Sequence, residues 1–80
     1  MNHDGIEKEN FDTQVVLLQE KIETLRVEHR ALDEKACELE KHLTLTPQEQ
    51  QELTRIKKRK LQLKDEIARY EYTLAQHKKS

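Results

Sequence analysis

The chain has 80 residues, enough for one small domain and too few for a core that encloses a pocket. Charged residues make up 39% of it, and the formal net charge of −1 argues against general attraction to nucleic acid or to a membrane surface. A single cysteine excludes an intrachain disulfide and favours a reducing, cytoplasmic setting. No apolar run approaches a membrane span, and the start, MNHDGIEKEN, shows no signal-peptide pattern.

Residues 1–10 are polar, contain the only Gly, and predict a flexible tail. A helix is predicted over about 12–43, because apolar residues then recur in alternating steps of three and four, as in the seam of a coiled coil. His29 is the one polar interruption of this first seam. Its members are Val15, Leu18, Ile22, Leu25, His29, Leu32, Ala36, Leu39 and Leu43.

A turn is predicted at residues 44–46, followed by a second helix over about 47–77 and a frayed end at 78–80. Thr46, Pro47 and Glu49 carry this prediction, since they match the N-cap, the first helical position and the capping-box glutamate. The second seam has two polar members, Lys60 and His77. It consists of Leu53, Ile56, Lys60, Leu63, Ile67, Tyr70, Leu74 and His77.

Two long helices joined by a short turn predict an all-α, antiparallel, coiled-coil-like hairpin. Placing Leu39 beside Leu53 and Ala36 beside Ile56 sets a register in which the flanking charges pair with opposite sign. The predicted pairs are Glu40 with Lys57, Asp33 with Lys64, Arg26 with Glu71, Lys35 with Glu52, Glu28 with Arg59, and Lys21 with Glu66. Each exposed pair is worth only about 0.2–1 kcal/mol, so this pattern supports the register without fixing it.

The segments HRALD at 29–33 and IKKRKLQLKDEI at 56–67 resemble the YdcH-like family of small bacterial helical proteins of unknown function. The family pattern has a His three residues before Leu-Asp, matched by His29, Leu32 and Asp33. Its second part, a Lys- and Leu-rich run ending in Lys-Asp-Glu-Ile, is matched through Ile67, with Ile56 where Leu is usual. The resemblance covers about 15–70 and implies a hairpin or coiled coil, with no activity to carry over.

His29, Asp33, Lys60 and Lys64 form the one predicted polar cluster. Each pair is spaced four apart on its helix, and the register brings the pairs together. The favoured interpretation is structural, since a polar seam residue fixes register and oligomeric state. Binding or pH sensing by His29 is the second interpretation. Catalysis is the least favoured, because no nucleophile or cleft accompanies the cluster.

The segment 55–64 is rich in Lys and Arg and is a candidate nucleic-acid contact. Its run KKRK, residues 57–60, points nearly all the way round a helix and has no aromatic neighbour for base stacking, so a solvated face is favoured. Cys37 and His42 lack the spacing of a metal-ligand pair. We expect no catalytic, cofactor or metal site, and no small-molecule substrate.

Leu61, Ala68 and Ala75 form a second apolar stripe off the seam, with Tyr72 at its edge and Lys58 beside it. A thin hairpin with a second stripe predicts association into a helical bundle, a homodimer being favoured over other oligomers or another helical partner. The sequence therefore favours a non-catalytic module for protein–protein interaction or self-association. The alternative is a small nucleic-acid-binding bundle that uses the basic segment 55–64.

Overall fold

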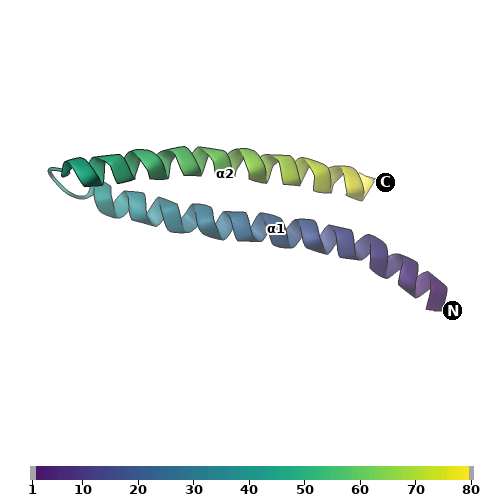
Figure 1. Cartoon of the computed structure of the whole chain (residues 1–80). Helices are drawn as coiled ribbons and strands as arrows, with labels where there is room; N and C mark the ends of the chain where they lie inside the picture. The colour runs from purple at the N-terminus through teal and green to yellow at the C-terminus, as the bar shows by residue number, and fades with distance from the viewer. Residues whose placement is uncertain (1, 80) are drawn as a thin grey trace.

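The computed structural model describes the backbone of residues 2–79 and the side chains of residues 13–77. Within that range the chain forms two α-helices, α1 (Asn2–Glu40) and α2 (Pro47–Lys79), and no strand. The helices run in opposite directions from the loop that joins them and pack side by side (Figure 1). The predicted all-α antiparallel hairpin is therefore confirmed.

The core lies along the two predicted seams. The side chains that are buried are Ile22, Leu25, Ala36, Leu39, Leu53, Ile56 and Leu63. Every other seam position with a described side chain is half-buried, except Leu43. Leu63 is the most deeply placed residue, at 0% exposure. The alternating three- and four-residue spacing succeeds because it keeps one stripe of each helix turned toward its partner.

The loop end of α1 differs from the prediction. The helix ends at Glu40, because the N–H of Lys41 is shared between Cys37 O at 3.2 Å and Glu38 O at 3.3 Å, and the N–H of His42 bonds Leu39 O at 3.1 Å. Bonds that reach back only three residues tighten a last turn and turn the chain away.

As a result, the placement of Leu43 in the seam is wrong, and its side chain is fully exposed. Leu45 fills that role instead, and packs with Leu32 against a buried cluster at the loop end of the hairpin. The cluster consists of Ala36, Leu39, Leu53 and Ile56.

The start of α2 matches the predicted capping box. The Glu49 N–H donates to Thr46 Oγ1 at 3.1 Å, and the Thr46 N–H donates to Glu49 Oε1 at 2.9 Å. The backbone hydrogen bond from Thr46 is the main reason that the pKa of Glu49 lies below its ordinary value, and the nearby charge of His42 adds to it. Two orphan N–H groups are satisfied reciprocally, so α2 begins sharply at Pro47.

The far ends of both helices extend beyond the predicted limits. α1 begins at Asn2, within the segment 1–10 predicted as a flexible tail, and α2 runs to Lys79, within the segment predicted to fray. The side chains of residues 2–12 and 78–79, and all of residues 1 and 80, lie outside the described residues. The flexibility of both segments stays a prediction.

Candidate functional site

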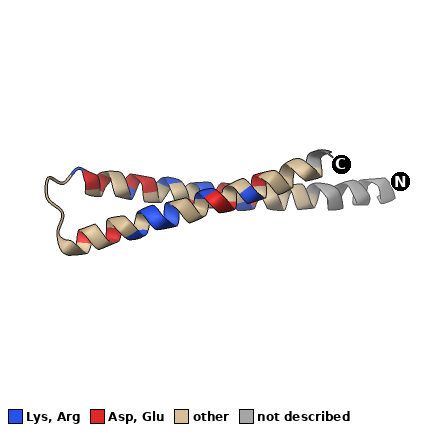
Figure 2. Cartoon of the chain, turned by 90° about the horizontal axis from the view of Figure 1, so that it is seen from above, with Lys and Arg blue, Asp and Glu red and all other residues tan. Residues whose placement is uncertain are grey.

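Interhelical ion pairs flank the seam on both sides and confirm its register. Four of the six predicted pairs are present: Arg26 with Glu71, Lys35 with Glu52 at 2.8 Å, Lys57 with Glu40 at 3.3 Å, and Arg59 with Glu28 at 2.9 Å. Figure 2 shows the basic residues of α2 among acidic residues of both helices. Much of the basic segment is therefore already paired within the hairpin.

Two predicted pairs are wrong. Asp33 pairs with Lys60 rather than Lys64, at 2.6 Å, because the seam position of Lys60 brings its ammonium group across to α1. Glu66 lies 3.9 Å from Arg59 on its own helix rather than beside Lys21.

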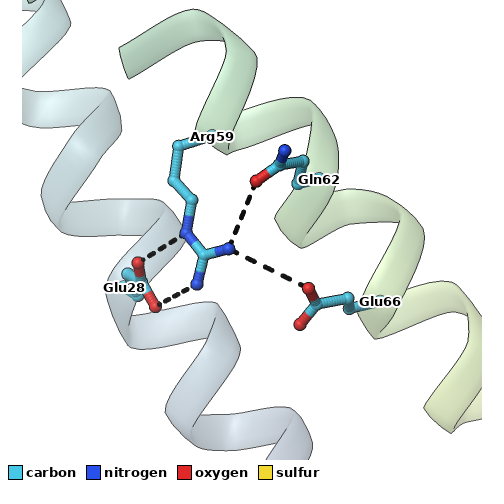
Figure 3. A network of polar contacts seen from close by, with 4 residues as sticks. All are labelled: Glu28, Arg59, Gln62 and Glu66. Atoms are coloured by element: carbon cyan, nitrogen blue, oxygen red, sulfur yellow. Dashed lines mark hydrogen bonds and ion pairs between the residues drawn. The ribbon is translucent and has the colours of Figure 1, made fainter. Parts of the chain in front are cut away.

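Arg59 is the centre of a polar network that joins the two helices (Figure 3). Its Nε and Nη2 atoms donate to the two carboxylate oxygens of Glu28, at 2.9 and 3.2 Å. Its Nη1 atom donates to Gln62 Oε1 at 3.4 Å and faces Glu66. The hydrogen bonds from Arg59 lower the pKa of Glu28 below its ordinary value. Because Glu28 binds the guanidinium in a bidentate arrangement, the Arg59 side chain is not available to an external anion.

The predicted polar cluster is assembled on one face of the hairpin. His29, Asp33, Lys60 and Lys64 line the same shallow depression, together with Lys57 and Leu61. Lys60 is the least exposed charged member, with 24% of its side chain accessible, and its Nζ donates to Asp33 Oδ1. That hydrogen bond and the charge of Lys60 hold the pKa of Asp33 below its ordinary value of 3.8.

Two members of the cluster carry a polar group that has no partner among the described side chains. The Nε2 atom of His29 is buried and has no hydrogen-bond partner. Lys64 has no ion pair with any described side chain, because Lys60 takes the carboxylate predicted for it. A buried polar atom without a partner, as at His29 Nε2, costs stability, whereas the exposed ammonium group of Lys64 is hydrated by solvent.

A second shallow depression adjoins the first and shares His29, Asp33 and Lys64 with it. Its further lining residues are Arg26, Arg30, Ile67, Ala68 and Glu71. Arg30 has no ion pair with any described side chain and was not singled out from the sequence. Its spacing of four residues from Arg26 and three from Asp33 was the available signal.

The predicted interaction surface consists of Lys58 and three residues of the second stripe and its edge, Leu61, Ala68 and Tyr72, and all four are exposed. Leu61 is 65% and Tyr72 68% exposed, and Lys58 and Ala68 are exposed as well. Leu61 and Ala68 belong to the two depressions around Lys64. Lys58 lies instead with Arg55 in a third depression on the outer side of α2 near Pro47. Tyr72 lines a fourth depression, toward the far end of α2. The surface therefore divides among three places.

Among the described residues, no group of three His, Cys, Asp or Glu side chains is placed to hold a metal ion. Cys37 is exposed and unpaired. No helix within the described range is long and apolar enough to cross a membrane. The depressions are open and lined by charged side chains, and none of them contains a nucleophile paired with a base.

Of the comparisons with known proteins, the one with family models gives a match. No curated protein matches the chain, and no solved structure does. A family model described as "Protein of unknown function (DUF465)" matches residues 22–71, which include most of the seam, the Arg59 network and the polar cluster. That match covers more than half of the chain and confirms the YdcH-like resemblance, so this chain belongs to the DUF465 family.

Proposed function

We propose that this hairpin is a non-catalytic, cytoplasmic interaction module that works by self-association. The observation that carries the proposal is the exposure of large apolar side chains on the outside of a thin hairpin. Leu17 at 58%, Val27 at 49% and Leu61 at 65% exposure belong to both helices and lie off the buried seam. Burial of apolar surface against a second hairpin is the common remedy for so small a core.

The polar features of the hairpin agree with this role better than with catalysis. The network at Arg59 joins the two helices to each other, and the described side chains of the polar cluster have no adjacent nucleophile or enclosed cavity. A polar residue in a seam commonly fixes register and oligomeric state. His29 and Lys60 stand at seam positions where such control operates.

Sedimentation equilibrium and thermal unfolding test self-association together. We expect the average mass to rise above that of one chain at protein concentrations between about 1 μM and about 1 mM. Dissociation constants in this range correspond to association free energies of about 8 to about 4 kcal/mol in magnitude. The melting temperature should rise over the same range, because association stabilises the folded state by mass action. A single-chain mass throughout, with a constant melting temperature, would contradict the proposal.

Nucleic-acid binding is a second candidate, and one observation favours it. Arg55 and Lys58 have no ion pair with any described side chain and line the same depression on the outer side of α2. Titration of RNA and DNA at several salt concentrations tests this candidate, because phosphate contacts release counterions and make affinity fall with salt. Absence of binding at low salt would exclude it.

A further inference from the structure

We infer that a second copy of this chain docks on the hairpin face around Lys64, using the outer side of its own α1. The inference rests on the proposed self-association and specifies its surfaces. The acceptor face consists of His29, Arg30, Leu61, Lys64 and Ala68. The donor face consists of Val16, Glu20, Glu23 and Val27.

The acceptor face alternates apolar and basic groups along α2. Leu61 lines one depression, Ala68 lines the next, and Lys64 lines both. Arg30 of α1 lies in the same depression as Lys64 and Ala68. Neither Arg30 nor Lys64 has an ion pair with a described side chain. This face therefore presents two positive charges that no described carboxylate pairs with, next to exposed apolar side chains.

His29 places the two depressions of the acceptor face side by side. Its side chain lines both of them, together with Asp33 and Lys64. Asp33 is bonded to Lys60, so it does not supply a carboxylate to Lys64.

The donor face has the complementary pattern. Val16 and Val27 are 44% and 49% exposed, and Glu20 and Glu23 between them are exposed with no ion pair to a described side chain. Steps of four, three and four residues place these side chains along one side of a helix. Along α1, the donor face therefore presents one apolar side chain, two acidic side chains and a second apolar side chain.

The two faces match in order and in charge. Glutamates of the donor face would meet Lys64 and Arg30, while its valines would contact Leu61 and Ala68. Within one chain these groups do not meet, because α1 and α2 are continuous helices held in register by the interhelical ion pairs. The contact therefore requires a second molecule, and opposite charges across it would set partner and orientation.

Charge reversal in the full-length chain tests the docking. We expect Glu23→Lys and Lys64→Glu each to weaken self-association by about tenfold or more in Kd, because each places like charges across the contact. The double variant should return to within about threefold of wild type, since the charges are exchanged rather than lost. A mixture of the two single variants should associate more tightly than either variant alone. Sedimentation equilibrium gives all four values.

Arg69→Glu and Glu34→Lys are matched controls, because both residues are exposed and have no ion pair with a described side chain. They should leave the Kd unchanged, and circular dichroism should show that every variant remains helical. Equal weakening by the controls, or no recovery in the double variant, would overturn the docking. If wild type associates and Lys64→Glu has no effect, the docking fails while self-association stands. If the wild-type protein remains a single chain, both the docking and the proposed self-association are contradicted.

Discussion

His29→Leu is the substitution that most directly probes the seam. The ring occupies a half-buried seam position, and its Nε2 atom is buried without a partner. An unsatisfied buried polar atom costs about 1–3 kcal/mol, and leucine at the same place removes that cost and adds apolar contact. Because His29 is only half-buried, we take the lower part of the range and expect a gain of about 1–2 kcal/mol in the free energy of unfolding.

That gain corresponds to a rise in melting temperature of about 4–16 °C, since 1 kcal/mol shifts a domain of this size by about 4–8 °C. Circular dichroism melting and urea unfolding at one fixed protein concentration measure it. Lys60→Leu is the matched comparison, because Lys60 is also a seam residue but bonds Asp33 at 2.6 Å. We expect its stability to change by less than about 1 kcal/mol, because Asp33 is exposed and an ion pair with solvent access contributes about 0–1 kcal/mol.

The result that would refute this reasoning is a loss of stability in His29→Leu. It would show that the ring takes part in a satisfied network, for example through water, and that its structural contribution is larger than the geometry indicates. An equal gain in both variants would show that leucine in the seam, rather than relief of the unpartnered atom, is responsible.

Other features of the hairpin give three further expectations. Leu63→Ala should lower the free energy of unfolding by about 2–5 kcal/mol, because Leu63 is 0% exposed, and urea unfolding will show whether the hairpin survives this loss. Thr46→Ala should lower it by about 0.5–2 kcal/mol by removing the side-chain bond to the Glu49 N–H, and an unchanged melting temperature would contradict the role of the capping box. The pKa values of Glu28 and Asp33 are lowered in the folded chain, so their stabilising effect is present above the ordinary carboxyl pKa and is lost as the pH falls through the folded values. Melting temperature against pH should therefore fall below about pH 4, and by less in Asp33→Asn, whose site no longer titrates.

The sequence predicts the backbone of this hairpin well because two independent local signals agree. Seam residues such as Ile22, Leu25 and Leu63 are spaced to bury one side of each helix, and all three are buried. Thr46 and Glu49 bond each other at the start of α2, as their spacing requires. Both signals depend on neighbours along the chain, and such neighbours are visible in the sequence.

The details of the polar cluster depend on competition across the helices and were less predictable. Lys60 and Lys64 both lie within reach of Asp33, and long lysine side chains make either pairing compatible with the same register. The seam position of Lys60 decides the outcome, and Lys64 is left without an ion pair among the described residues. Leu43 and Leu45 show the same limit at the loop, where a turn tightened by His42 decides which leucine reaches the core.

The structure also limits how strongly the basic segment 55–64 can hold nucleic acid. Its Lys57, Arg59 and Lys60 are bonded to acidic residues of α1. Arg55, Lys58 and Lys64 have no ion pair with any side chain that the structure describes. Lys64 lies in the face around His29, and the other two line a depression near Pro47.

A contact that uses these three cations would neutralise about three phosphates for each copy, giving a slope of about −3 in a plot of log affinity against log salt. A much steeper slope from a single copy would mean that the interhelical ion pairs open on binding. Lys57→Gln would distinguish that case, because it would reduce the slope only if Lys57 leaves Glu40 for a phosphate.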